Sequence, residues 1–133
     1  MHYDDFVEKV RRAANIETTH DSQLAVKATL ATFGERLTRT EKVELGAQLP
    51  KELKSYLVEM GDVERFSLEE FYNRVAARAD LGRPDAVKRS RAVMMVLQEA
   101  VTEGLLKPIR QRLPAEYDEL FGSEPHSPLS PTR

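Results

Sequence analysis

A short phrase occurs twice in this chain, and its recurrence constrains the possible fold more than any other feature. Leu49-Pro50-x-Glu52 returns as Leu113-Pro114-x-Glu116, an offset of 64 residues. Upstream residues match at this offset or at 65, and the matched apolar residues recur with the spacing of a helix face. These matches predict a duplicated helical unit in which both copies bury the same surface. The clearest pairs are Phe6 with Phe71, Val10 with Val75, Leu30 with Met94, Phe33 with Leu97 and Leu45 with Ile109.

Each copy is expected to form four helices, because apolar stripes with helical spacing occur in both copies. The second helix of each copy should be the longest. No segment combines alternating apolar and polar residues with turn chemistry, the pattern that predicts a strand. The stripes of the first two helices are Tyr3, Phe6, Val10 and Ala14, then Val26, Leu30, Phe33 and Leu37, and in the second copy Leu68, Phe71, Val75 and Ala79, then Val87, Met94, Leu97 and Val101.

Capping signals place several helix starts. Ser67 and Thr38 each precede a glutamate by three residues, which predicts capping boxes with Glu70 and Glu41. The prolines of the repeated phrase suit the first turn of a helix, where the missing amide proton costs nothing. The glutamates of the same phrase are expected to cap free amides at these helix starts.

The seventh helix departs from the pattern. Its expected cap, Thr102, has no glutamate three residues later, and Pro108 lies where the helix should already be running. A proline inside a helix removes a hydrogen bond and costs about 3 kcal/mol. This helix is therefore expected to be kinked or to begin close to Lys107.

The length of the chain decides how the copies combine. The chain has 133 residues, of which 41% are hydrophobic and 32% charged, so each copy has only about 60 residues and a marginal core of its own. The expected fold is all-α, with two pseudo-symmetric four-helix repeats, 1–62 and 63–122, packed into one compact domain. Residues 123–133 hold three prolines and three serines and are expected to form a disordered tail.

Composition excludes several classes of function. The absence of cysteine removes disulfides, thiolate metal sites and cysteine nucleophiles. A formal net charge of −2 gives no overall attraction to nucleic acid or to anionic lipid. The chain shows neither a secretory signal nor an apolar run of about 20 residues, the length that spans a bilayer. These features predict a soluble cytoplasmic protein with no membrane partner.

The order of the motifs resembles a known family. "QLP-x-E" in the first half, "RLP-x-E-Y" followed by "LF" in the second, and "FSLEEFYNRVAARADL" before an arginine-rich long helix carry the resemblance. They are similar to the bacterial family catalogued as domain of unknown function 2267, over residues 3–122. The resemblance implies a cytoplasmic, all-α bacterial protein and carries over no catalytic residue. The start of the seventh helix departs from the family's usual Ser/Thr-Pro-Gly-Glu-like turn.

No constellation of catalytic or metal-binding residues is visible in the sequence. His2, His20 and His126 lie at the terminus, in a loop and in the tail, without a carboxylate or second histidine at helical spacing. The six glycines form no phosphate-binding loop, and no serine lies in a nucleophile elbow. The sequence therefore predicts a protein that is not an enzyme and uses no cofactor.

One basic set is a candidate site for an anion or an acidic partner. It lies on the fifth and sixth helices, where a helical hairpin would bring some members to one face. Nine basic and nine acidic side chains in residues 66–121 favour an ordinary neutralised surface instead. Aromatic residues for base stacking are missing from the set. The set is Arg74, Arg78, Arg83, Lys88, Arg89 and Arg91, and the acids expected to neutralise it are Glu69, Glu70, Asp80 and Asp85.

Elimination leaves a non-catalytic interaction or regulatory module that binds another protein through a helical surface. The first alternative is binding of nucleic acid or phosphate through residues 74–91, which the balanced charge disfavours. The second alternative is an enzyme or small-ligand carrier with a site between the repeats. A buried cluster of ionisable groups would favour that second alternative. The partner and the oligomeric state are left open by the sequence.

Overall fold

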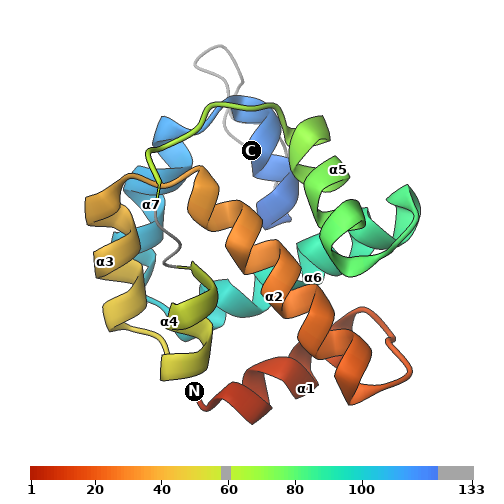
Figure 1. Cartoon of the computed structure of the whole chain (residues 1–133). Coiled ribbons are helices and arrows are strands. Elements are labelled where there is room, and N and C mark those ends of the chain that lie inside the picture. Colours follow the sequence, from red (N-terminus) through yellow and green to blue (C-terminus); the bar gives the residue numbers. More distant parts are fainter. Residues whose placement is uncertain (58–60, 123–133) are drawn as a thin grey trace, which may run out of the picture.

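The computed structural model describes residues 1–57 and 61–122, and every regular element in these two ranges is a helix. This confirms the expected all-α class, while the predicted disordered tail lies outside the described residues. Figure 1 shows the arrangement of the helices. They are α1 (Tyr3–Ala13), α2 (Thr19–Glu35), α3 (Arg39–Ala47), α4 (Lys51–Leu57), α5 (Leu68–Ala79), α6 (Arg83–Ala100), α7 (Glu103–Arg112) and the 3-10 helix η1 (Ala115–Phe121).

The order and the starts of the helices follow the spacing of the repeated sequence. The start of α5 lies 65 residues after that of α1, at residue 68 against residue 3. The starts of α6, α7 and η1 each lie 64 residues after those of α2, α3 and α4. We call α1–α4 the first half and α5–η1 the second half. The pseudo-symmetry of the halves and the boundary at residues 62 and 63 stay predictions.

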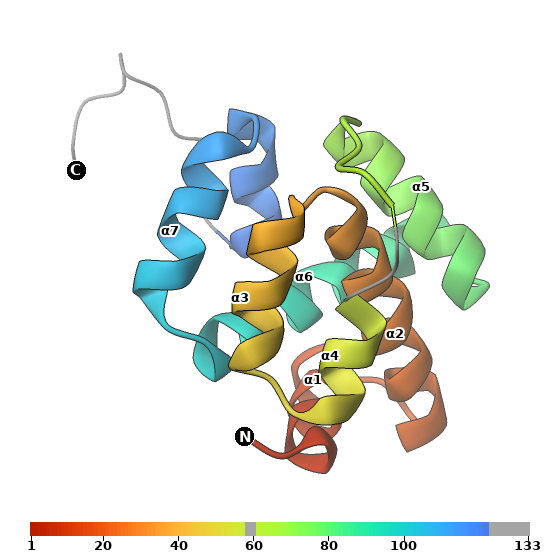
Figure 2. The ribbon, with the colours of Figure 1, turned by 60° about the vertical axis from the view of Figure 1, so that its left-hand side comes forward.

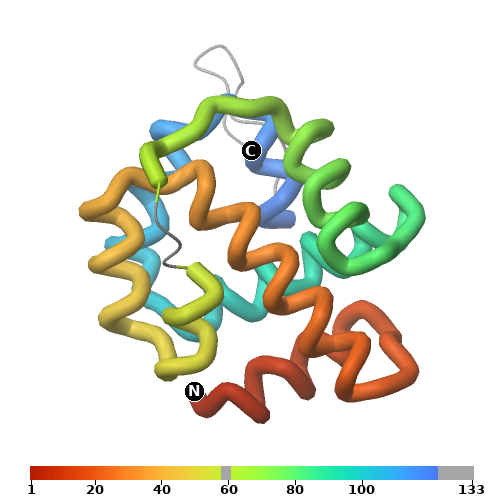
Figure 3. The backbone as a smooth tube through the Cα atoms, viewed as in Figure 1, coloured from red at the N-terminus to blue at the C-terminus, as the bar shows by residue number. Residues whose placement is uncertain are grey.

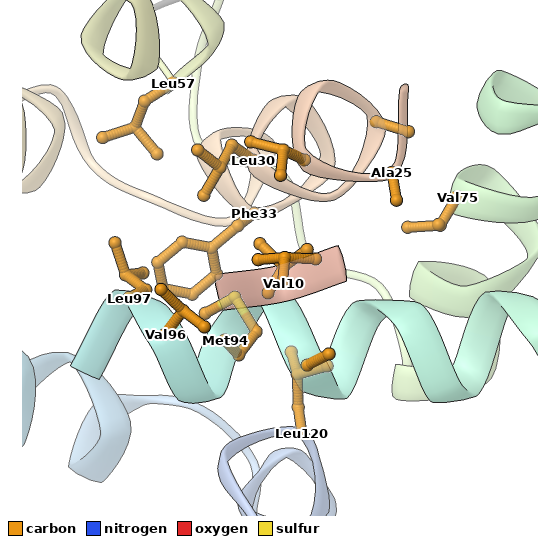
Figure 4. Close-up of a cluster of buried hydrophobic side chains, with 14 of the residues drawn as sticks. Val10, Ala25, Leu30, Phe33, Leu57, Val75, Met94, Val96, Leu97 and Leu120 are labelled. Carbon is orange, nitrogen blue, oxygen red and sulfur yellow. The ribbon is translucent and has the colours of Figure 1, made fainter. Parts of the chain in front are cut away.

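The two longest described helices, α2 and α6, pack against each other at the centre of the molecule. The first helix of each half, α1 or α5, packs against both of them, and so contacts the long helix of the other half as well as its own. One hydrophobic cluster runs through both halves. Figure 4 shows Phe33 of α2 reaching towards α6, beside Met94 and Leu97. The core therefore belongs to both halves together.

The predicted capping box of α3 is confirmed, and that of α5 is confirmed only in part. The Thr38 hydroxyl accepts a hydrogen bond from the Glu41 amide, and the Glu41 carboxylate accepts one from the Thr38 amide. The Ser67 hydroxyl accepts from the amide of Glu70. The Glu70 carboxylate accepts from the Arg74 guanidinium, because a charged donor makes a stronger hydrogen bond than a backbone amide.

The repeated prolines lie one residue earlier than predicted. Pro50 and Pro114 directly precede the first helical residues of α4 and η1. Their carbonyls accept the first hydrogen bonds of these helices, from the amides of Lys54 and Tyr117. Pro114 has a ψ of 150°, which is the extended conformation of a capping residue. Each proline thus turns the corner between two helices from outside the second one.

The start of α7 differs from the prediction. This helix begins at Glu103, so the predicted start near Lys107 is wrong. The Gln48 side chain, at the end of α3, accepts from the Thr102 amide at 2.8 Å and donates to its hydroxyl at 3.3 Å. A residue of the first half thus replaces the missing cap. Figure 2 shows α3 and α7 side by side. A kink at Pro108, the alternative expectation, stays a prediction.

Candidate functional site

The connecting segment, residues 61–67, crosses from the first half to the second above the C-terminal end of α2 (Figures 1 and 3). It has no regular structure and is held by Glu64. The Glu64 amide donates to the carbonyl of Glu35 at 2.8 Å, and the Glu64 carbonyl accepts from Arg36 at 2.8 Å. The Glu64 carboxylate accepts from Arg74 at 3.1 Å. Polar contacts from both halves therefore fix the path of this segment.

Two members of the predicted basic set, Arg74 and Arg78, lie beside this segment and are already neutralised. Arg74 donates to the carboxylates of Glu35, Glu64 and Glu70 at 2.9 to 3.1 Å. Arg78 makes two hydrogen bonds of 2.8 Å to the Glu35 carboxylate. Because their donors point at carboxylates, these two guanidiniums have little capacity for a further anion. They hold α5 against α2.

The ion pairs of Glu35 determine its protonation. Burial raises the pKa of Glu35, but hydrogen bonds from Arg78 and Arg74 outweigh burial, so that the pKa lies below its ordinary value. The carboxylate is therefore charged at neutral pH and contributes to stability in that form.

Glu35→Gln should remove part of the acid sensitivity of the protein. Because the folded-state pKa lies below the ordinary value of 4.5, the contribution of Glu35 is present above that pH and is lost as the pH falls through the folded-state pKa. We expect a cost of about 1 to 2 kcal/mol at neutral pH that shrinks in acid. Urea unfolding followed by far-UV circular dichroism measures this cost, once at neutral pH and once in acid. Glu17→Gln, at an exposed site, is the control; an equal cost at both pH values would contradict the assignment.

The other four members of the predicted set lie on α6. Arg83 is paired with Glu69 of α5 through hydrogen bonds of 2.6 and 2.8 Å. Lys88 and Arg91 are exposed and Arg89 is partly buried, and within the described ranges none of these three has an ion pair. Arg74 and Arg78 lie on α5, which packs against α6. The structure thus pairs three of the six residues with carboxylates, Arg74, Arg78 and Arg83, and a shared patch of all six stays a prediction.

Glu35 was missed as a partner because the neutralising acids were expected next to the arginines in sequence. The alignment of the two repeats could have indicated this pairing. Arg74 matches Lys9 at an offset of 65, and Glu35 matches Glu99 at an offset of 64. Lys9 pairs with Glu99 at 2.9 Å, and Arg74 pairs with Glu35 at 3.0 Å. Matched charges thus tie the first helix of each half to the long helix of the other.

A buried arginine outside the predicted basic set lies under the connecting segment. Arg36, directly after α2, is only 4% exposed. Its guanidinium lies over the rings of Phe66 and Tyr117, with the carbon 5.5 and 5.0 Å from the ring centroids. Among the described residues it has no carboxylate partner, and its Nε has no hydrogen-bond partner. A guanidinium keeps its charge at physiological pH, so burying one without a counter-ion is costly.

Arg36 lines an open cleft of about 500 Å³, which we call the arginine cleft. It lies between the end of α2, the connecting segment and the corner between α7 and η1. Arg112 lines it as well and is held by the Glu41 carboxylate at 2.6 and 3.0 Å. Arg65 is exposed and has no partner in the described ranges. The remaining lining residues are Phe66, Ser67, Pro114 and Glu116.

The cleft keeps an excess of positive charge. Burial raises the pKa of Glu41, but hydrogen bonds from Arg112 and Thr38 outweigh burial and lower it overall, so Glu41 is charged and neutralises Arg112. Burial raises the pKa of Tyr117 to about 12, and its neutral hydroxyl donates to the Phe66 carbonyl at 2.8 Å. Arg36 and Arg65 remain as guanidiniums without a carboxylate of their own in residues 1–57 and 61–122.

The matching positions of the other half carry no arginine. Arg36 corresponds to Ala100 and Arg112 to Gln48, each at an offset of 64. Ala100 ends α6 and Gln48 caps α3, so these neutral residues occupy similar places in their helices. The helical framework accepts neutral side chains at both places.

Other features of the described residues are weaker candidates for a binding site. No cluster of three or more histidine, aspartate or glutamate side chains in residues 1–57 and 61–122 could hold a metal ion. A second cleft, of about 490 Å³, lies beside α7 and has a mixed lining. Its Arg110 already approaches Asp118 at 3.7 Å and covers the Phe121 ring at 4.8 Å. Its other two charged lining residues, Glu103 and Lys107, are opposite in sign, so this cleft has no excess of positive charge among the described residues.

Comparisons with known proteins agree with the resemblance read from the sequence. A family model described as "Uncharacterized conserved protein (DUF2267)" matches residues 3–120. A search among curated proteins gives no match. Across the described ranges, no helix combines the length and the apolar character needed to cross a bilayer. The match spans 118 of the 133 residues, and the chain belongs to the family of domain of unknown function 2267.

Proposed function

We propose that this protein is a non-catalytic binding module, and that the arginine cleft is where it holds an anionic group of its partner. The observation that carries the proposal is Arg36, a guanidinium 4% exposed that has no carboxylate partner among the described residues. A bound carboxylate or phosphate would supply the missing counter-charge, and Arg65 could bond to the same group.

The proposal combines two hypotheses drawn from the sequence. An interaction module would receive the anionic group on a side chain of another protein, and a small-ligand carrier would receive it on a free molecule. A cleft of about 500 Å³ has the size of a small-molecule site and is open to solvent. Both sources present the same chemistry to the arginines, and we place the protein in the cytoplasm as part of the proposal.

Binding of nucleic acid through residues 74–91 is the weaker proposal. Arg74, Arg78 and Arg83 already hold carboxylates. A phosphate backbone would have to displace these acids before it could use the arginines. No carboxylate of the described residues has to be displaced from Arg36 or Arg65 in the arginine cleft.

Arg65→Ala should weaken the binding of inorganic phosphate by about tenfold or more without changing the stability of the fold. Removing one charge-assisted hydrogen bond costs about 1.5 to 3 kcal/mol, and an exposed side chain without partners contributes little to folding. Titration followed by the backbone amide and arginine Nε signals in heteronuclear NMR gives the affinity. Lys88→Ala, an exposed basic residue of α6, is the matched control. Equal affinities of Arg65→Ala and the unchanged protein would overturn the proposal.

A second experiment distinguishes an anionic group on a protein partner from a free small anion. The unchanged protein and Arg65→Ala serve as baits in parallel pull-downs at low and high salt. A protein retained by the first bait and lost from the second identifies a macromolecular partner. Empty baits together with Arg65-dependent binding of phosphate identify a small anion as the ligand.

A further inference from the structure

One carboxylate lines the arginine cleft at its exposed side. Glu116 of η1 lines the cleft, and its Oε2 accepts a hydrogen bond from the Leu68 amide at 3.1 Å. The sequence predicted that Glu116 would cap its own helix, and the structure shows it at the first residue of α5 instead. Its Oε1 has no hydrogen-bond partner, and no arginine lies within ion-pair distance, in the ranges that the structure describes. The cleft therefore contains a fixed acceptor beside its guanidiniums.

The position of this carboxylate has a physical reason. The first amides of a helix have no partner inside the helix and carry partial positive charge, which favours a negative group there. The Leu68 amide uses one oxygen of Glu116 and leaves the other for a further donor. A simple anion entering the cleft meets Arg36 and Arg65 but is repelled by Glu116. A ligand that also carries a donor turns this repulsion into a hydrogen bond.

We propose that the arginine cleft selects ligands with a hydrogen-bond donor, such as an ammonium group, beside their phosphate or carboxylate. The anionic group bonds to Arg36 and Arg65, and the donor bonds to Oε1 of Glu116. A charge-assisted hydrogen bond of this kind strengthens binding by about tenfold or more. This inference rests on the proposed function and names the class of ligand that the same site takes.

Two free small molecules test the selectivity, because they carry the same charges at neutral pH and only one of them can donate hydrogen bonds from its cationic nitrogen. Phosphoethanolamine has an ammonium group that donates hydrogen bonds, and phosphocholine has a trimethylated nitrogen that cannot donate. We expect the unchanged protein to bind phosphoethanolamine about tenfold tighter than phosphocholine. Glu116→Gln should reduce this ratio to near one and strengthen the binding of inorganic phosphate. The Leu68 amide signal in heteronuclear NMR reports on the Glu116 carboxylate directly.

The matched control is Glu52→Gln, because Glu52 holds the same place in the repeated phrase of the first half and is exposed. It should leave the ratio unchanged. Equal affinities for phosphoethanolamine and phosphocholine, with binding that still depends on Arg65, would overturn this inference and leave the proposed function standing. No saturable binding of any of the three phosphates would overturn both.

Discussion

Gly34→Ala is expected to destabilise the protein by about 3 kcal/mol or more, although alanine is the better helix former by about 1 kcal/mol. A Cβ atom at residue 34 would lie 2.3 Å from the carbonyl oxygen of Leu57 and 3.2 Å from its carbonyl carbon. Both atoms belong to the backbone of α4, so no side chain can rotate away to make room. The added methyl group must therefore push α4 away from α2, against which it packs.

Urea unfolding followed by far-UV circular dichroism measures this cost. Gly104→Ala in α7 is the matched control, because nothing lies within 4 Å of the added Cβ atom there. That control should gain up to about 1 kcal/mol from helix propensity. If Gly34→Ala is as stable as the unchanged protein, α4 does not approach α2 as closely in solution as the structure shows.

The two halves make the matching contact in different ways. Gln98 occupies the place of Gly34 at an offset of 64, and Phe121 occupies the place of Leu57. The Gln98 side chain donates to the Phe121 carbonyl at 3.1 Å, where the first half has direct contact with the helix backbone. From the sequence alone, a glycine inside a helix indicates only a low helix propensity at that residue. Gly34 is required because the backbone of α4 lies against it, and the sequence around Gly34 does not reveal this contact.

Sequence patterns predicted the helices well because a helix depends mainly on residues that are close together in the sequence. The apolar stripe that includes Phe71 and the capping box of Thr38 depend on residues within one or two turns. The failures involve partners that are distant in sequence. Gln48 supplies the cap that α7 lacks, and Glu116 caps α5. No periodicity within a single helix contains such information.

The candidate site shows the same division. The sequence pointed to Arg74 and Arg78 because they stand at helical spacing, yet their partner Glu35 lies on another helix. Arg36 was missed because it follows an apolar stripe and resembles an ordinary polar residue at a helix end. Its burial comes from the rings of Phe66 and Tyr117, which belong to other segments. An uncompensated charge becomes visible only when the tertiary structure is known.

Phe33→Ala is expected to lower the free energy of unfolding by about 3 to 5 kcal/mol. Phe33 is fully buried on α2, and its ring meets that of Phe121 of η1 edge to face, with centroids 6.1 Å apart. Removing the ring opens a cavity between the two halves and also loses this aromatic contact. Met95→Ala is the control, because the Met95 side chain on α6 is 53% exposed and should contribute little.

The same variant also tests whether the two halves unfold together. Hydrogen exchange of amides in α2 and in η1, measured beside circular dichroism, shows whether both halves lose protection together. If Phe33→Ala fails to fold, Phe33→Leu, with a smaller expected cost, answers the same question. Protection lost in one half alone would mean that the halves are separate domains. One shared transition would mean that the arginine cleft, built from segments of both halves, exists only in the intact fold, so a bound anion must stabilise both halves together.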